Sequence, residues 1–264
     1  MLASTSAGNC TVVWNDRVSF LVDCGASVSY TETALAGLGL SLSELSAVFI
    51  THSHGDHVNN HTVSKLAALN VPIIAHEKVA MVLRKKFPHL RDKKSSIAAY
   101  TGGTTVSNGF SFTPFPVPHD ANGGCFGYSF LLEHAAGEHK VSIATDLGAA
   151  LPDLVSCFAD SDIIVIESNH DVTMLAESLR PQWLKDRIIQ TGHLSNDECC
   201  AFISQVIAAS IKFPAAIVLA HISQECNTNS HATGCMRDML ALTQKSHIAV
   251  VETFKENPSV VVSV

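Results

Sequence analysis

Residues 47–57 read Ala47-Val48-Phe49-Ile50-Thr51-His52-Ser53-His54-Gly55-Asp56-His57. The apolar run at 47–50 predicts a short buried strand. Four residues of metal-ligand type follow it within six positions: His52, His54, Asp56 and His57. Imidazole and carboxylate groups together suit zinc and other divalent first-row metals. The spacing of His52 and His54 lets both side chains converge on one ion, while Asp56 and His57 point towards a second. A His-rich surface loop is the alternative, but so dense a group behind an apolar strand disfavours it.

The composition is that of a globular chain. The 264 residues are 47% hydrophobic and 16% charged, which excludes a disordered chain or a coiled coil. No apolar run reaches the ~20 residues of a transmembrane helix, and the N-terminus lacks the features of a secretory signal. The net charge of −7 excludes a histone-like polycation. The eight cysteines are scattered and include no CxxC pair, so we expect them to be mostly reduced and the protein to be cytoplasmic, without a membrane partner.

Strand-like runs alternate with helical ones along the whole chain. Besides 47–50, the predicted strands are residues 10–14, 17–23, 71–75, 128–133, 141–145, 163–166, 215–219 and 248–252. The predicted helices are residues 61–69, 195–210 and 233–244. Residues 110–117 alternate despite their prolines, which predicts an edge strand, and for 259–264 we favour a last strand over a dimer contact. No repeat or linker interrupts the pattern, so we expect one domain over 1–264 of the α/β (α+β) class, with two packed sheets and helices outside.

The segment at residues 52–57 matches the HxHxDH motif of the metallo-β-lactamase superfamily, and Leu21-Val22-Asp23-Cys24-Gly25 resembles the strand and turn before that superfamily's first helix. This resemblance implies a four-layer αββα sandwich. It also implies further ligands after later strands, and His119, Asp146 and His221 occupy those places in order. An isolated aspartate after a strand is often only a turn residue, but the order of all three favours ligands.

The family pattern implies two divalent metal ions, zinc or manganese. One ion would be held by His52, His54, His119 and Asp146. The other would be held by Asp56, His57, Asp146 and His221. Asp23 and Asp120 are candidates for orienting the ligand histidines, since such histidines need hydrogen-bond acceptors that set their tautomers.

Two late segments, Gly192-His193-Leu194-Ser195 and Ala220-His221-Ile222-Ser223, resemble the nuclease branches of the superfamily, including ribonuclease Z. In that resemblance His193 faces the scissile phosphate, helped by a carboxylate that by position is Glu167. The residues support this independently, because Ser195 and Glu198 have capping-box spacing and place His193 just ahead of a helix N-terminus, where anions bind. Ser195 is then a second candidate for substrate binding. A cap-region histidine bonded to a carbonyl is the alternative for His193, and His170 either contacts substrate or braces its loop.

Segments spanning nearly the whole chain resemble the YycJ/WalJ/VicX-type subfamily, regarded as DNA-directed phosphodiesterases with exonuclease-type activity. The segments are Leu2–Asn9, Val22–Gly25, His52–His57, Pro118–Ala121, Ala144–Gly148, Glu167–Asp171 and Gly192–Asn196. One departure is Thr5, where a Ser-Gly-Ser-Ser type turn would have glycine. The resemblance implies a binuclear phosphodiesterase that cleaves DNA ends with a hydroxide between the metals, with Asp56 or Glu167 handling protons.

Other functions share this motif. A small-molecule hydrolase, such as a thioesterase, would use the same metals but has no need of an anion site at His193. A metal-stabilised binding module would also keep all seven ligands. Residues 84–94 hold six basic residues and one acid, which suits either a phosphate-tracking arm with Phe87 stacking on a base or, as we favour, a solvated loop. Residues 122–124 form either a substrate-admitting loop or a turn, and the oligomeric state stays open.

Overall fold

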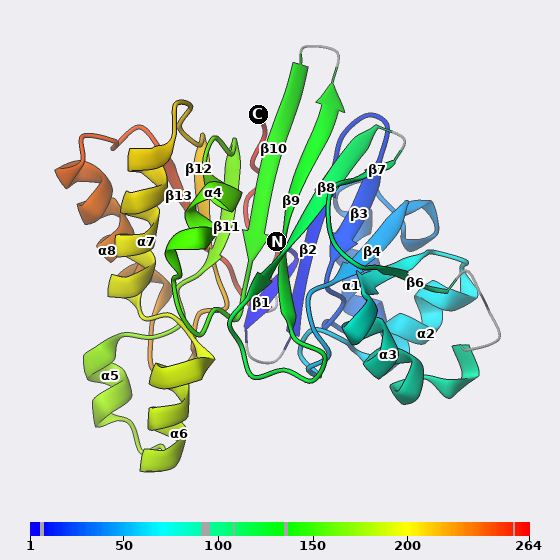
Figure 1. Cartoon of the computed structure of the whole chain (residues 1–264), viewed down its shortest axis with the longest axis horizontal. Coiled ribbons are helices and arrows are strands. Elements are labelled where there is room, and N and C mark those ends of the chain that lie inside the picture. The colour runs from blue at the N-terminus through cyan, green and yellow to red at the C-terminus, as the bar shows by residue number, and fades with distance from the viewer. Residues whose placement is uncertain (6–7, 91–95, 108, 135–136, 256) are drawn as a thin grey trace.

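The computed structural model describes residues 1–5, 8–90, 96–107, 109–134, 137–255 and 257–264. Two mixed β-sheets pack face to face in this structure (Figure 1). The first has the strand order β1 (Ala3–Thr5), β2 (Gly8–Trp14), β3 (Ser19–Val22), β4 (Ala47–Ile50), β5 (Ile73–His76), β6 (Ile97–Tyr100). The second has the order β13 (Ala249–Val251), β12 (Ala216–Ala220), β11 (Ile163–Glu167), β10 (Gly137–Ala144), β9 (Cys125–His134), β8 (Phe110–Val117), β7 (Thr105–Ser107).

Helices cover the outer face of each sheet (Figure 1). The first sheet carries α1 (Val28–Ala36), α2 (Asn60–Ala68) and α3 (Glu77–Lys86), and the second carries α4 (Val155–Phe158), α7 (Asn196–Ala209) and α8 (Asn229–Leu242). Short 3-10 turns occur at Leu42–Glu44, Pro88–Leu90 and Pro152–Leu154. The predicted four-layer αββα sandwich is therefore confirmed. No helix within the described ranges is long and apolar enough to cross a membrane.

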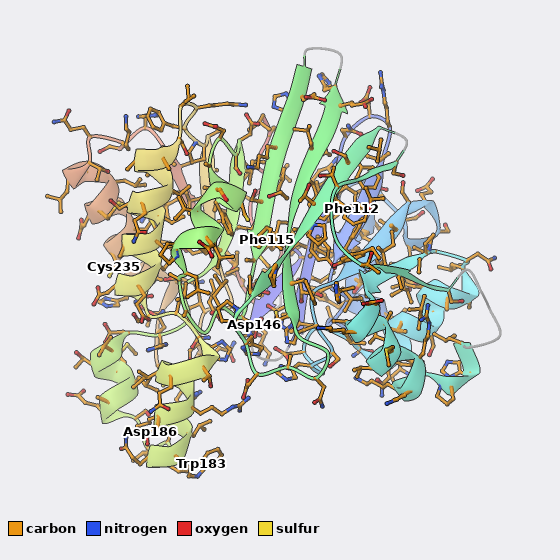
Figure 2. The ribbon with its side chains drawn as sticks, in the orientation of Figure 1. Phe112, Phe115, Asp146, Trp183, Asp186 and Cys235 are labelled. Atoms are coloured by element: carbon orange, nitrogen blue, oxygen red, sulfur yellow. The ribbon has the colours of Figure 1, made fainter. Side chains whose placement is uncertain are left out.

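A helical arm extends beyond the sandwich. It consists of α5 (Val172–Glu177), α6 (Gln182–Arg187) and the π-helical turn η4 (Ile188–Gly192). Trp183 and Asp186 lie at its tip, below the sheet edge that carries Asp146 (Figure 2). This arm was not predicted from the sequence, because its two helices are one to two turns long and too short to show a periodic apolar pattern.

The strands in the middle of each sheet are apolar on both faces because both faces are covered. In β4, Phe49 points between the sheets, whereas Ile50 points towards the helices of the first sheet. The ring of Phe49 lies 4.8 to 5.4 Å, centroid to centroid, from four other aromatic rings, those of Phe20, Phe112, Tyr128 and Phe130. Aromatic pairs at such distances stabilise a core beyond their buried area. This cluster fixes one sheet against the other.

The pairing directions place the ends of many strands at one edge. Strands β3 to β6 are parallel, and so are β10 to β13. Parallel strands bring their carboxyl ends to the same side of a sheet, which is where open α/β folds bind ligands. The polar residues that follow β3, β4, β10, β11 and β12 therefore meet at one edge of the sandwich.

Two predictions about strands were wrong. Residues 110–117 form β8, but β8 is not an edge strand, because β7 pairs with residues 110–112. Pro114 and Pro116 lie beyond the end of β7, so their missing N–H groups cost no bond to it. Residues 259–264 form no strand. The Ser259 N–H donates instead to the Met1 carbonyl at 2.9 Å, and the segment crosses the N-terminus rather than joining a sheet.

Candidate metal centre

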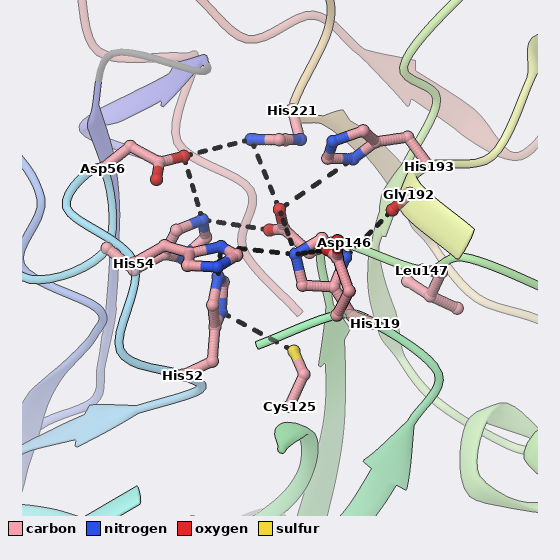
Figure 3. Close-up of polar contacts among 12 residues, drawn as sticks. His52, His54, Asp56, His119, Cys125, Asp146, Leu147, Gly192, His193 and His221 are labelled. Atoms are coloured by element: carbon pink, nitrogen blue, oxygen red, sulfur yellow. Dashed lines mark hydrogen bonds and ion pairs between the residues drawn. The ribbon is translucent and has the colours of Figure 1, made fainter. Parts of the chain in front are cut away.

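The seven predicted metal ligands meet at the carboxyl-terminal edge of the two sheets (Figure 3). Ligand-type atoms of His52, His54 and His119 lie within 4.8 Å of one another, and so do those of Asp56, His57, Asp146 and His221. Asp146 lies between the two groups. Its Oδ1 is 3.7 Å from His119 Nε2 and its Oδ2 is 3.0 Å from His57 Nε2. Two groups of ligand-type atoms thus lie on either side of the Asp146 carboxylate, and their division into two ion sites stays a prediction.

The ligand atoms are arranged as a cation would require. His54 Nδ1 lies 3.0 Å from His52 Nε2 and 3.3 Å from His119 Nε2, so three ring nitrogens face one point. The buried Oδ2 of Asp146 lies 3.0 Å from His57 Nε2 but accepts no well-aligned hydrogen bond from a described residue. Buried polar atoms rarely stay unpaired, and an ion is one explanation for the exceptions. The residues present therefore fit divalent metal ions.

In every ligand histidine except His54, Nε2 faces the centre and Nδ1 contacts a hydrogen-bond acceptor. The pairs are His52 Nδ1 to Thr51 Oγ1 at 3.0 Å, His57 Nδ1 to Asp23 Oδ2 at 2.7 Å, His119 Nδ1 to the Gly192 carbonyl at 3.0 Å, and His221 Nδ1 to Glu167 Oε1 at 2.7 Å. An Nδ1–H that donates outward leaves the Nε2 lone pair facing the centre. Such contacts fix the tautomer and raise the basicity of a ligand histidine. Asp23 has the orienting role that we predicted for it.

Asp120 does not have that role. Its carboxylate instead accepts two hydrogen bonds from Arg187 of the helical arm, at 2.6 and 2.9 Å. The guanidinium lowers the pKa of Asp120. The backbone carbonyl of Gly192 takes the place at His119 Nδ1. No local pattern in the sequence indicates either contact, since both join residues about 70 positions apart.

Neighbouring carboxylates raise the pKa of two histidines in the centre. Burial acts to lower the pKa of His57, but Asp146 and Asp23 raise it well above its usual value. Burial likewise opposes protonation of His221, yet Asp146, Asp56 and Glu167 raise its pKa to about 10. Burial acts to raise the pKa of Asp146, but the charges of His221 and His57 keep it well below the usual range. Metal ions binding here would replace protons on His57 and His221.

Three residues of the centre have left-handed backbone conformations. Asp23, Asp146 and His221 have φ of 61°, 57° and 53°, and they are half of the six non-glycine residues with positive φ in the described ranges. Each lies within two residues of a strand end. Such conformations cost about 1–3 kcal/mol each and gather at functional sites. Here they turn the chain sharply after the strand, so that the side chain enters the centre.

Glu167 joins His193 to the metal ligands. Its Oε1 accepts from His193 Nδ1 at 2.8 Å and from His221 Nδ1 at 2.7 Å, and its Oε2 accepts from the N–H groups of Leu147 and Leu194 at 2.9 and 3.1 Å. The side chain is fully buried. His193 is bonded to this carboxylate and not to a backbone carbonyl, and 21% of its side chain is exposed. The pair lies beside Asp146, and Asp146, Glu167, His193 and His221 form a third cluster of ligand-type side chains.

The other two candidates for substrate binding are buried. The predicted capping box is confirmed, with the Ser195 hydroxyl and N–H both bonded to Glu198. Ser195 is 4% exposed and His170 is 2% exposed. Burial lowers the pKa of His170, and its Nδ1 has no partner among the described residues. Both side chains are therefore almost fully enclosed.

Two segments that we considered for substrate contact are bound into the fold. Phe87 is 3% exposed, which excludes the alternative in which it stacks on a base. The solvated loop that we favoured is also wrong for residues 84–86, which form the last turn of α3. Phe87 packs in the core under α3, and residues 91–95 of the basic segment lie outside the described residues. The segment 122–124 is a turn, and the Ser53 hydroxyl donates to the Asn122 carbonyl at 3.0 Å. This bond ties the turn to the metal-ligand loop.

Asn9 is a neighbour of the centre that sequence analysis did not single out. Its Nδ2 lies 3.0 Å from His57 Nε2 and 3.3 Å from Asp56 Oδ2. It reaches the site because β2 packs beside the metal-ligand loop, where Gly25 lets the chains approach closely. A Cβ on Gly25 would collide with the Asp56 carbonyl.

The fold and the His/Asp cluster define a metal-dependent hydrolase of the metallo-β-lactamase type. Residues 19–222 match the family model described as the β-lactamase superfamily domain, and the chain belongs to that family. It is 29% identical over 228 residues to exodeoxyribonuclease YycJ of Bacillus anthracis, an alignment that covers 86% of this chain and 83% of the relative.

Solved structures share the fold at lower identity. The metallo-β-lactamase fold protein YhfI of Bacillus subtilis superposes with a TM-score of 0.70 and 15% identity, covering 98% of this chain and 95% of that one. The short form of human tRNase Z gives a TM-score of 0.61 and 17% identity, covering 84% of this chain and 92% of that one. These likenesses show the fold, and the predicted resemblance to the nuclease branch is confirmed by the relative named as an exodeoxyribonuclease.

Proposed function

We propose that the protein is a phosphodiesterase that carries two divalent metal ions and degrades DNA from its ends. The observation that carries this proposal is the contact of His193 with Glu167 directly beside the shared ligand Asp146. A thioesterase has no need of a second polar cluster at that place, whereas a phosphodiester needs a group near its leaving oxygen. The relative named as an exodeoxyribonuclease, aligned over most of both chains, supports DNA as the substrate. We place this activity in the cytoplasm, consistent with eight free cysteines.

In this proposal the two ions occupy neighbouring positions. His52, His54 and His119 would hold one, Asp56, His57 and His221 the other, and Asp146 would be shared. Two such ions supply Lewis-acid stabilisation of charge on the phosphate and lower the pKa of water. Imidazole and carboxylate ligands suit zinc or manganese.

The protein's own side chains then orient the group near the leaving oxygen and transfer protons. Glu167 is a positioning residue, because all of its hydrogen-bond contacts are to protein donors and it has no exposed surface. It orients His193, whose partly exposed ring stabilises the developing charge at the leaving oxygen. Of the two carboxylates that we considered for proton transfer, Asp56 is the better placed. Its side chain is 21% exposed, and its Oδ1 makes no hydrogen bond to a described residue.

Hydrolysis of bis(p-nitrophenyl) phosphate by protein loaded with zinc or manganese tests the proposal. We expect turnover, and a loss of about 100-fold or more in Asp146→Ala. Asp160→Ala is a matched control, since Asp160 also has positive φ but lies in an exposed turn whose carboxylate binds the N–H groups of residues 211 and 212. End-labelled DNA then shows whether digestion starts at ends. Faster turnover of acyl-CoA or glutathione thioesters than of phosphodiesters would refute the proposal.

A further inference from the structure

We propose that a pocket between the helical arm and the metal centre binds a second phosphate group of the nucleic-acid strand, with Arg180 and Arg187 as its charged donors. This inference rests on the proposed function. The pocket has a volume of about 160 Å³ and is lined in part by both arginines, His193 and Ser223. A water molecule occupies about 30 Å³ in the liquid, so the space is large enough for a phosphate group.

Both guanidinium groups keep donors that face no protein acceptor. Arg180 Nε donates to Glu225 at 2.9 Å, and its two terminal nitrogens have no partner in the ranges that the structure describes. Arg187 binds Asp120 through Nε and Nη2, and Nη1 likewise has no partner there. A carboxylate on one side of each guanidinium holds it in place while the other side stays available. Arginine binds phosphate through several N–H groups in a fixed plane, so such orientation favours recognition.

The floor of the pocket adds a neutral donor. Ser223 is 3% exposed, and its Oγ accepts the N–H of Cys226 at 3.1 Å. Its hydroxyl hydrogen is therefore free to donate to a bound oxygen. Leu184 and Ile188 form an apolar wall, which lowers the local dielectric and strengthens hydrogen bonds to an anion.

The pocket adjoins the metal centre through residues that contact both. His193 lines the pocket and also lies 3.9 Å, Nδ1 to Oδ1, from Asp146. Gly192 lines it as well, and its carbonyl accepts from His119. The bidentate pair of Arg187 with Asp120, the residue after His119, joins the arm to the ligand loop. A strand whose scissile phosphate lies at the metals and which passes His193 would place its next phosphate in this pocket.

The bound phosphate is either the terminal phosphate of the strand or an internal phosphodiester. The two cases differ in the end preference that they predict for the enzyme. A terminal phosphate would make the enzyme prefer a phosphorylated end over a hydroxyl end. An internal phosphodiester would be bound equally well with either end. Both sources share the chemistry of an oxyanion held by arginine.

Arg180→Gln is the test variant, because its carboxylate partner, Glu225, is exposed and is bonded to no metal ligand among the described residues. The measured quantity is kcat/KM for a single-stranded oligonucleotide divided by kcat/KM for bis(p-nitrophenyl) phosphate, which has no second phosphate. We expect this ratio to fall about tenfold or more, through KM, as for the loss of a charge-assisted contact. The salt dependence of oligonucleotide binding should weaken by about one unit of slope. Loss of a preference for 5′-phosphate over 5′-hydroxyl ends would identify a terminal phosphate, and equal loss for both an internal one.

Two control variants distinguish the loss of a contact in the pocket from a general change of charge on the arm. Lys185→Gln removes a charge from α6, but Lys185 bonds to the Ala176 carbonyl and lies outside the pocket. Glu225→Gln removes the negative charge beside Arg180 but keeps an amide oxygen that can accept from Arg180 Nε, so the guanidinium stays oriented. We expect the ratio for both to stay within about twofold of the wild type, well short of the loss of a hydrogen bond. An unchanged ratio in Arg180→Gln, or an equal fall in either control, would overturn the inference.

Binding without turnover keeps the two proposals distinguishable. Fluorescence anisotropy of a labelled oligonucleotide compares Asp146→Ala with the Asp146→Ala, Arg180→Gln double variant. If the wild type hydrolyses nothing but Arg180→Gln weakens binding, the proposed function fails and the pocket stands. If Arg180→Gln changes neither binding nor the ratio, the pocket fails while the phosphodiesterase stands.

Discussion

Glu167→Gln replaces a fully buried carboxylate by an amide of nearly the same shape. All four groups that contact Glu167 are donors: two imidazole N–H groups, of His193 and His221, and two backbone N–H groups. A carboxylate accepts from all of them, whereas an amide offers one acceptor oxygen and one NH₂ group. Whichever way the amide turns, two donors face the NH₂ group.

Each orientation has a defined cost. If the NH₂ group faces the backbone, two buried N–H groups lose their acceptor, at about 1–3 kcal/mol each. If it faces the histidines, His221 must accept at Nδ1 and carry its proton on Nε2, where it can no longer ligate a metal. Removing one partner of a buried charged pair costs about 3–5 kcal/mol. We therefore expect the free energy of unfolding to fall by that amount, and the metal affinity of the His221 site to fall about 10–100-fold.

Urea unfolding and chelator competition measure the two effects. Glu198→Gln is the matched control, because Glu198 serves only the capping box of α7. It should lose about 1 kcal/mol and bind metal as the wild type does. If Glu167→Gln binds two ions with affinities within about twofold of the wild type, the tautomer argument is refuted, because the loss of such a contact costs at least tenfold.

Three further perturbations test the rest of the structure. Asp23→Asn should weaken metal binding about 10–100-fold in the same competition assay, because its NH₂ group must face either His57 Nδ1 or the Thr51 N–H, both of which donate to the carboxylate. Phe49→Ala should cost about 3–5 kcal/mol in urea unfolding, as expected for a buried aromatic side chain between two sheets. Metal binding at pH 7 should release protons from His57 and His221, measurable by calorimetry in buffers of different ionisation heat. Because the pKa of His221 is raised from 6.5 to about 10, its contribution to metal-free stability is complete below pH 6.5 and is lost as pH rises through about 10.

The candidate metal ligands could be proposed from the sequence because they follow buried strands. Residues 163–166 and 215–219 are apolar runs of strand length, and the structure forms β11 and β12 there within one residue. Parallel pairing then brings the residues after these strands to one edge. Asp146 and His221 could thus be expected at the same edge of the sheet without knowledge of the register between the strands.

The helix α3, which ends in the basic segment, was not predicted from the sequence. Val79, Leu83 and Phe87 are spaced by four and are all buried, so residues 77–86 form α3 against the first sheet. Arg84, Lys85 and Lys86 end this helix, and in the sequence these charges indicate a solvated loop more strongly than the apolar spacing indicates a helix. The helix also begins at His76, whose side chain accepts from Lys78 N–H at 3.3 Å in place of the usual serine or aspartate cap. Because α3 has an unusual N-cap and a charged last turn, it was not predicted from the sequence.

The metal centre depends on the packing of the sheets, not only on the loops that carry its ligands. His52, His54, Asp56 and His57 follow β4 of the first sheet, whereas Asp146 and His221 follow β10 and β12 of the second. No single sheet therefore contains a complete site. The aromatic cluster around Phe49 sets the distance between the two sets of ligands, and ions that bind both sets would in turn hold the sheets together. Ligands that bind only the folded state add RT ln(1 + [L]/Kd), about 2.7 kcal/mol at 100 times Kd. The stabilisation by metal and the spacing needed for catalysis thus depend on the same inter-sheet packing, which is why a core substitution such as Phe49→Ala should weaken metal binding as well as the fold.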